Sequence, residues 1–211
     1  MEDPGLVSAM AGADRIGVDV PLGWPVAFVK AIARHEQGKR WRGEDRDAMR
    51  FRETDRHVRA NVPPILPLSV STEKLGVTAL RGAALIDQLS RRGVAVDRSG
   101  VDGPVAEVYP AAALCRWIGR RCSYKGRAPK DPRDELLAQL LAGVGGAMEM
   151  GDDARAACVA SDHAFDAFVS SLVARAVARG KTARPPKKQR ELARQEGWIH
   201  VPEEGSLGAL S

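Results

Sequence analysis

The sequence predicts an α/β fold in which short parallel strands alternate with several helices. Residues 16–20 alternate apolar and polar side chains, and in residues 105–109 Val105, Glu107 and Tyr109 share one face of a second strand. Each run stops at a proline, which lacks the N–H that a strand ladder needs. Apolar residues recur at helical spacing most clearly over residues 73–92 and 162–179. Strands that alternate with helices of this length are typical of a parallel sheet.

Local signals place the elements before the second strand. Residues 5–13 are long enough for only a short helix, and Pro25 suits the first turn of a helix that follows the first strand. Residues 37–50 carry many charges without an apolar period, so we expect a loop. A short helix capped by Thr54 should follow, and then the long helix over 73–92, which is capped by Ser71 or Thr72 and closed by Gly93.

The second half should be mostly helical. Pro110 stops the second strand and opens a helix to Ile118, and Asp131-Pro132 caps and opens a helix with leucines at 136, 137, 140 and 141. Ser161 caps the helix over 162–179, and a short helix is expected around 191–195.

Size and composition indicate one globular domain. The chain has 211 residues, of which 44% are hydrophobic and 28% charged, so we expect a single domain over 1–202 and a disordered tail over 203–211. It contains no apolar run of about 18 residues and begins with acidic residues, so we expect a cytoplasmic protein with no membrane partner. The cysteines, at 115, 122 and 158, lack the paired spacing of a zinc site.

Acidic side chains are the candidate catalytic groups. Asp19 and Glu107 lie near the ends of the two strands, and Asp166 lies one turn after Asp162 on the edge of a helix's apolar stripe. If the strands are parallel neighbours, these carboxylates converge, and two of them about 5 Å apart repel by roughly 3 kcal/mol. A divalent cation would relieve that repulsion. We therefore expect Mg²⁺ or Mn²⁺ held by Asp19, Glu107 and Asp166. Asp162 by itself is explained by the preference for a carboxylate at a helix N-terminus.

Basic residues suggest a polyanionic partner. The net charge is +5, and cations concentrate in residues 39–59, 116–130 and 181–194. Such runs can hold the phosphate backbone of nucleic acid. The candidate contact residues are Arg52, Arg120, Arg121 and Lys125.

The chain resembles the domain-of-unknown-function 429 family. Seven blocks carry the resemblance in order along the chain: residues 16–23 (IGVDVPLG), 67–72 (PLSVST), 76–81 (GVTALR), 107–112 (EVYPAA), 124–125 (YK), 162–167 (DHAFDA) and 196–202 (EGWIHVP). The resemblance implies an RNase H-like fold and a nuclease activity. By it, Asp19 stands on the fourth strand of the sheet, Glu107 on the fifth and Asp166 on the final helix. The resemblance also implies Asp162 as a further metal ligand.

One departure from that family pattern bears on activity. An RNase H-like domain begins with three antiparallel strands, whereas only 15 residues precede the first strand here, and strands need about five residues each. We therefore expect either an N-terminally shortened sequence or a degenerate, inactive member. In both cases the first strand should have an open edge beside Asp19.

The sequence also raises three functions other than a nuclease. A non-catalytic remnant that binds nucleic acid or a partner would keep the basic runs without a complete metal site. An ATP-dependent kinase shares the sheet, but the sequence has no glycine-rich phosphate loop of the expected type. A serine or cysteine hydrolase would need a nucleophile elbow, which the sequence also lacks.

Overall fold

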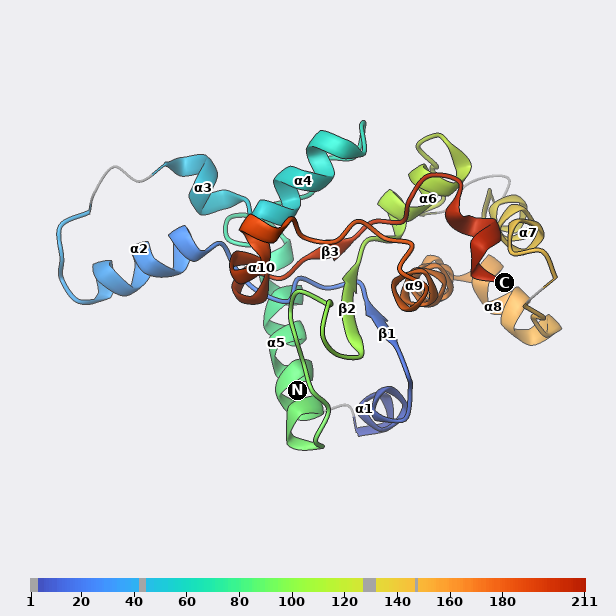
Figure 1. The fold of residues 1–211 in the computed structure, drawn as a ribbon, viewed down its shortest axis with the longest axis horizontal. Helices are drawn as coiled ribbons and strands as arrows, with labels where there is room; N and C mark the ends of the chain where they lie inside the picture. The colour runs from blue at the N-terminus through green and yellow to red at the C-terminus, as the bar shows by residue number, and fades with distance from the viewer. Residues whose placement is uncertain (1–3, 42–44, 127–131, 147) are drawn as a thin grey trace. The chain divides into compact units, whose positions relative to one another are not determined.

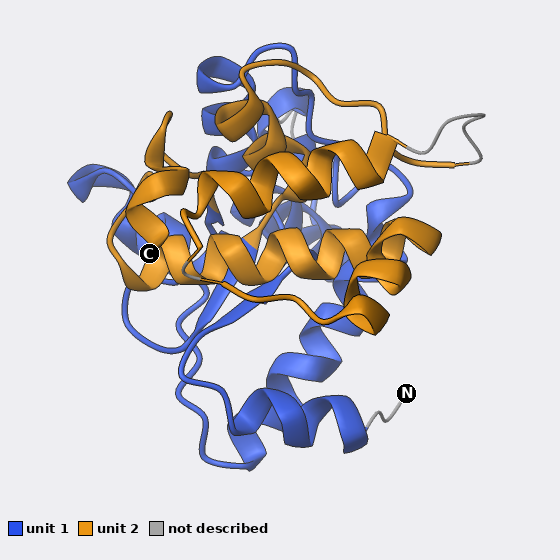
Figure 2. Cartoon of the chain, turned by 90° about the vertical axis from the view of Figure 1, so that its right-hand side faces the viewer, with its two compact units in different colours: residues 1–107, 184–199 blue, residues 108–183, 200–211 orange. Residues whose placement is uncertain are grey.

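The structure is a computed structural model that describes residues 4–41, 45–126, 132–146 and 148–211. The chain divides into two compact units (Figure 2). Unit 1 comprises residues 1–107 and 184–199, and unit 2 comprises residues 108–183 and 200–211. From the sequence we expected one domain over 1–202.

Unit 1 combines the strands with helices from both ends of the chain (Figure 1). Strands β1 and β2 pair in parallel, with Val18 opposite Glu107, and the sheet order is β1-β2-β3. The predicted α/β class with short parallel strands is therefore confirmed. The elements are α1 (Pro4–Ala11), β1 (Ile16–Val18), α2 (Val26–Glu36), α3 (Arg46–Arg50), α4 (Glu53–Asn61), α5 (Leu75–Arg91), β2 (Val105–Val108), η1 (Lys187–Gln189), α10 (Arg190–Glu196) and β3 (Ile199–His200). The last residues of β2 and β3, Val108 and His200, belong to unit 2.

The core of unit 1 lies between β1, β2 and the helices α1 and α5. Val7 on α1 and Leu89 on α5 are at most 1% exposed, and they cluster with Val18 and Val105 from the strands. These positions follow the apolar period that the sequence shows for α5. Gly93 takes a φ of 81° just after that helix, as predicted.

Unit 2 is helical around α9. Its elements are α6 (Pro110–Ile118), α7 (Pro132–Gly143), α8 (Asp152–Ala160), α9 (Asp162–Ala178) and η2 (Ser206–Leu210). Helix α9 packs against α6 and α8, and Ser161 caps it by accepting from the Ala164 N–H at 3.4 Å. Phe165, Val169 and Leu172 of its apolar stripe are fully buried, and Phe168 is partly buried against the same core.

Three segments differ from the sequence-based expectations. Helix α3 lies inside the expected loop 37–50, because Asp45 accepts from the Asp47 N–H at 2.9 Å and so caps a helix start. Helix α8 was not predicted. Where we expected a disordered tail over 203–211, η2 buries Leu207 and Leu210 in the core of unit 2.

Two predicted caps differ as well. Lys74, and not Ser71 or Thr72, precedes α5, and its side chain makes no capping hydrogen bond. Residue Arg52, not Thr54, precedes α4, and the Thr54 hydroxyl accepts from the Ile199 N–H at 2.7 Å. The predicted cap Asp131 lies outside the described residues. Among the helices that the structure describes, none has both the length and the apolar content needed to cross a membrane.

Candidate functional site

Asp19 borders a cavity of unit 1 at the carboxyl end of β1. The residue is exposed and directly follows the strand, which stops because Pro21 cannot extend a ladder. The cavity has a volume of about 500 Å³, and Thr78 and Arg81 of α5 contribute polar groups to its wall. A carboxylate and a guanidinium thus line one cavity, at the end of a parallel strand where α/β proteins bind ligands.

The open edge expected beside Asp19 is present. β1 is the end strand in the sheet order, and its three residues line the same cavity as Asp19. The Ile16 N–H donates to the Pro104 carbonyl at 2.8 Å, toward β2. Because successive residues of a strand turn their N–H and C=O groups to opposite sides, the backbone of Gly17 faces the open edge.

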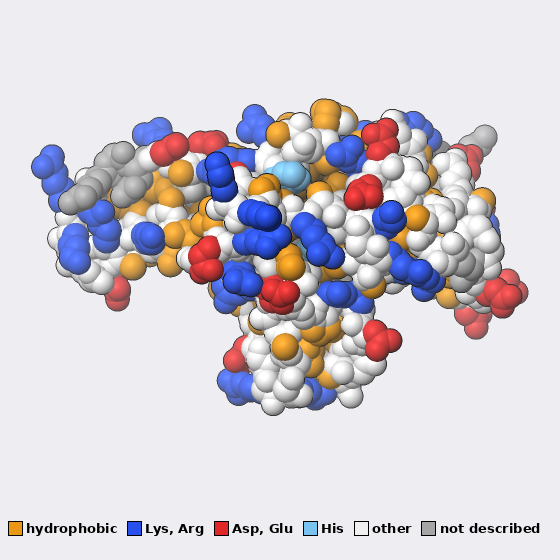
Figure 3. Space-filling view, viewed as in Figure 1, with side chains coloured by type: hydrophobic (Ala, Val, Ile, Leu, Met, Phe, Trp, Pro, Cys, Tyr) orange, Lys and Arg blue, Asp and Glu red, His pale blue; other side chains and the backbone are white. Residues whose placement is uncertain are grey.

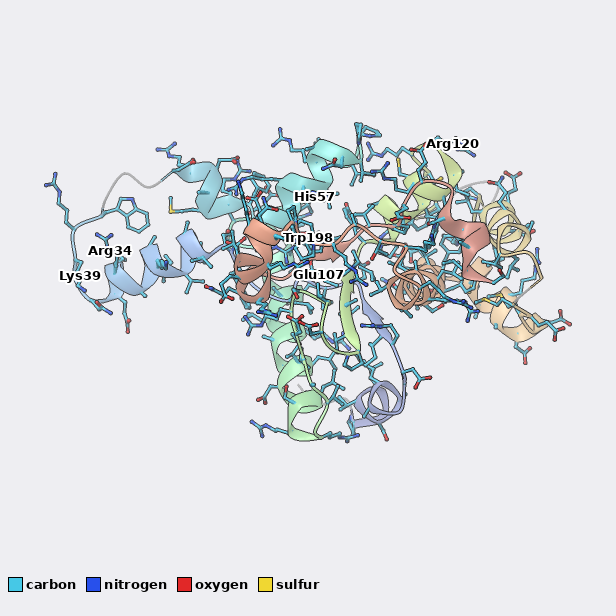
Figure 4. All side chains as sticks on the ribbon, viewed as in Figure 1. Arg34, Lys39, His57, Glu107, Arg120 and Trp198 are labelled. Carbon is cyan, nitrogen blue, oxygen red and sulfur yellow. The ribbon has the colours of Figure 1, made fainter. Side chains whose placement is uncertain are left out.

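Glu107 lies in the interior of unit 1 (Figure 4). It is 3% exposed, and both of its oxygens accept from the Arg52 guanidinium at 2.8 Å. The Leu22 N–H also donates to Oε2 at 3.0 Å. Burial raises the pKa of Glu107, while Arg52 and the Leu22 N–H act in the opposite direction.

Arg52 is the centre of a buried network of charges. It is 2% exposed, and every N–H of its guanidinium donates: to Glu107, to Asp55 and to the Glu196 carbonyl. Burial by itself would lower the pKa of Arg52, but the two carboxylates raise that pKa above its usual value. The sequence suggested Arg52 as a nucleic-acid contact, whereas the structure places it in the interior with its donors used.

The carboxylates of unit 1 do not fit a divalent metal ion. A metal on Glu107 would have to displace the Arg52 guanidinium, because both carboxylate oxygens already accept from it. Over the described part of the chain, no three or more His, Cys, Asp or Glu side chains are grouped so as to hold a metal ion. The described residues therefore do not fit the predicted Mg²⁺ or Mn²⁺ site.

Asp166 of unit 2 is held by two neighbours from one loop. Its Oδ1 accepts from the Tyr124 hydroxyl at 2.7 Å, and its Oδ2 pairs with Lys125 Nζ at 2.8 Å. The side chain of Asp166 is 13% exposed and that of Lys125 is 57% exposed. Asp162, one turn earlier, is 31% exposed at the start of α9, where a carboxylate suits the helix dipole.

Arg133 supports this group and was missed from the sequence. It is 7% exposed, and it donates to the carbonyls of Tyr124 at 2.8 Å and Val159 at 2.9 Å. A signal was available, because Arg133 stands in the first turn of α7, where the helix dipole disfavours a cation. An arginine at such a position needs acceptors elsewhere.

The remaining predicted cations of unit 2 are on its surface. Arg120 and Arg121 are exposed and follow α6, which is closed by Gly119 with a φ of 77°. Figure 4 shows Arg120 just after this helix. Their positions are compatible with contact to a phosphate backbone.

A more concentrated basic segment lies in unit 1. Residues 184–194 contain five cations and one acid, and Lys and Arg side chains gather over α10 in Figure 3. Arg184, Lys187, Lys188 and Arg190 are exposed and make no ion pair with any described residue. The opposite side of α10 is buried through Ala193 and Glu196, so these cations are carried by an anchored segment.

Glu196 provides much of that anchor. Its side chain is 5% exposed, and its two oxygens accept from the Val26 N–H at 2.7 Å and the Glu53 N–H at 2.8 Å. These N–H groups open α2 and α4, where helix ends lack intrahelical acceptors. The carboxylate thus fixes α10 to two helix N-termini.

Comparison with known proteins gives a family without a described activity. The model of the family described as protein of unknown function (DUF429) matches residues 4–191. Searches of curated proteins and of solved structures found no match. Because the matched range covers most of the chain, the protein belongs to the DUF429 family.

Proposed function

We propose that this protein binds nucleic acid through its phosphate backbone. The observation that carries the proposal is the basic segment 184–194, whose four exposed cations Arg184, Lys187, Lys188 and Arg190 have no ion-pair partner among the described residues. Arg120 and Arg121 of unit 2 form a second exposed cationic group. Surface cations without carboxylate partners are the groups that replace condensed counterions on a polyanion.

The burial of α10 supports binding rather than a merely solvated surface. A flexible basic tail would lose conformational entropy when it binds, at roughly 1–2 kcal/mol per ordered residue. Here the backbone is already fixed by Glu196 and by the burial of Ala193. The cations of this segment therefore lose less conformational entropy on binding a ligand than the cations of a disordered segment would.

The test compares two variants of equal charge. In the first, all four cations of the segment become glutamine: Arg184→Gln, Lys187→Gln, Lys188→Gln and Arg190→Gln. In the control, four exposed cations elsewhere in unit 1 become glutamine: Arg59→Gln, Lys74→Gln, Arg91→Gln and Arg92→Gln. We expect the first variant to bind labelled 20-nucleotide DNA and RNA about tenfold more weakly at low salt than the control. Equal loss in both variants would show that only net charge matters and would contradict the proposal.

The second candidate function is hydrolysis of a phosphodiester, as the family's resemblance to RNase H-like nucleases implies. One observation favours it: Asp19 and Arg81 line the same cavity at the carboxyl end of β1. A carboxylate can accept a proton from an attacking water, and a guanidinium can hold a phosphate. As part of this second proposal, we infer that the sheet has an RNase H-like arrangement.

Cleavage of labelled DNA and RNA, with Mg²⁺, with Mn²⁺ or with EDTA, tests the second candidate. We expect Asp19→Asn to abolish any cleavage, because the amide cannot accept the proton. Asp14→Asn is the control, since Asp14 is also exposed and lies outside the cavity wall. Cleavage that survives Asp19→Asn would exclude Asp19 as the catalytic base.

A further inference from the structure

Trp41 differs from the other tryptophans of the chain. Its side chain is 50% exposed, whereas Trp24 and Trp117 are partly buried and Trp198 is fully buried. An indole is a large apolar surface that proteins usually bury or use for binding. Trp41 lies in unit 1, shortly after α2 ends at Glu36.

The surroundings of Trp41 are aromatic and basic. Its ring meets the His35 ring edge-on, with 5.7 Å between the ring centroids, so one neighbour helps to orient it. Lys39 and Arg40 directly precede it, are exposed and form no ion pair with the residues that the structure describes. Figure 4 shows Lys39 just beyond the helix that carries Arg34.

The same helix lines a second cavity of unit 1. The cavity has a volume of about 680 Å³, and Lys30, Arg34 and Arg56 bring cations to its wall. Apolar side chains complete the wall, among them Val26 on α2 and Leu192 on α10. Two of the cations lie on α2, which leads toward Trp41, and Leu192 lies on α10, within the basic segment 184–194.

Two elements of unit 1 connect these features. Leu192, within the basic segment 184–194, lines the cavity, and helix α2, which carries two cations of the cavity wall, ends at Glu36, shortly before the exposed indole of Trp41. Glu196 lines the cavity, but its two oxygens already accept from backbone N–H groups at the starts of α2 and α4. The wall keeps positive charge from Lys30 and Arg34 on α2. Arg56 contributes less, because it is paired with Asp47 at 3.3 Å and with Glu53 at 3.2 Å.

We propose that Trp41 stacks on an unpaired base, so that this protein prefers single-stranded nucleic acid. The inference rests on the proposed nucleic-acid binding and names its substrate class. In a duplex the faces of the bases are covered by their neighbours, whereas a single strand offers them to an aromatic ring. Cations that hold phosphates beside an aromatic stacking platform are the usual means of binding single strands.

The experiment measures binding of the full chain to a labelled 20-nucleotide DNA, as a single strand and as a duplex. We expect Trp41→Ala to weaken single-strand binding by about 5- to 150-fold and to change duplex binding by less than about twofold. Trp41→Phe, which keeps a stacking ring, should recover most of the affinity. The slope of affinity against salt should stay unchanged, because the indole carries no charge.

Leu66→Ala is the matched control, because Leu66 is another exposed large apolar side chain of unit 1, at 65% exposure. It should leave both affinities unchanged. Equal effects of Trp41→Ala on single and double strands, or no effect on either, would overturn the preference for single strands alone. A wild-type chain that binds neither form would overturn both this inference and the proposed function.

Discussion

At the scale of single residues, Arg52 and Glu107 show how strongly burial decides the role of a charge. Both side chains are at most 3% exposed, and they are joined by two hydrogen bonds of 2.8 Å. Removing water from two charges is costly unless each finds a close partner. In this chain the pair, together with Asp55, fixes the start of α4 to strand β2.

Breaking this pair should therefore cost stability. We expect Glu107→Gln to lower the free energy of unfolding by about 3 kcal/mol, because it leaves the buried Arg52 with one carboxylate fewer. Urea denaturation followed by circular dichroism measures the change. Asp87→Asn is the control: Asp87 pairs with Arg91 at 2.9 Å, but their side chains are 58% and 77% exposed. The control should change stability by at most about 0.5 kcal/mol, and similar losses in both variants would contradict a structural role for the buried pair.

The Arg52 and Glu107 pair also marks a limit of sequence reasoning. Glu107 was recognisable as a carboxylate near a strand end, but its partner lies 55 positions away in the sequence. The residues that flank a side chain in the sequence predict which helix or strand it belongs to and which face of that element it lies on. They do not predict which distant residue it contacts. For the same reason Glu196, which joins two helix N-termini, was not recognised.

At the scale of elements, helix α5 packs closely on the segment that follows β1. A Cβ built on Gly82 would lie 2.9 Å from the Pro21 carbonyl oxygen and 2.9 Å from Val20 Cγ2. Real Cβ atoms do not approach backbone oxygen so closely, so the absence of a side chain sets how near the helix lies. This approach forms part of the wall of the cavity beside Asp19.

Gly82→Ala should destabilise the protein although alanine is the better helix former. We expect a loss of about 1–3 kcal/mol, because the methyl group forces α5 away from the segment after β1. The matched control is Gly76→Ala in the same helix, where the nearest atom to a Cβ is the Val70 carbonyl oxygen at 3.6 Å. That control should be neutral or stabilising by up to about 1 kcal/mol. Thermal unfolding of both variants measures the difference in stability. Equal shifts in Tm would show that a methyl group at the close approach does not destabilise the protein.

Periodicity and capping predicted the long elements, and their failures have physical reasons. The stripe of α9 is regular and fully apolar, so its position and its Ser161 cap followed from the sequence. In α8 only Cys158 is buried, so the helix shows almost no apolar stripe. Strand β3 has two residues, too few for an alternation to appear.

At the scale of the whole molecule, the family and the α/β class with parallel strands followed from the sequence, while the division into two units did not. A boundary is visible in sequence when composition changes at a linker. Here residues 184–199 of unit 1 lie between the two segments of unit 2, so the chain crosses the boundary three times. The sequence identified the charged residues of the candidate site. The residues that they contact could not be predicted, because this discontinuous folding brings them together.

The central claim is that cations of the basic segment 184–194 contact the phosphate backbone of nucleic acid. The most direct measurement is the slope of log binding constant against log salt concentration for a single strand. Because each phosphate contact contributes about 0.7 to that slope, the variant with four glutamines in the segment should lose about 3 units of slope relative to wild type. The control with four glutamines elsewhere in unit 1 should keep the wild-type slope. A slope that is the same in wild type and in the segment variant would contradict the claim.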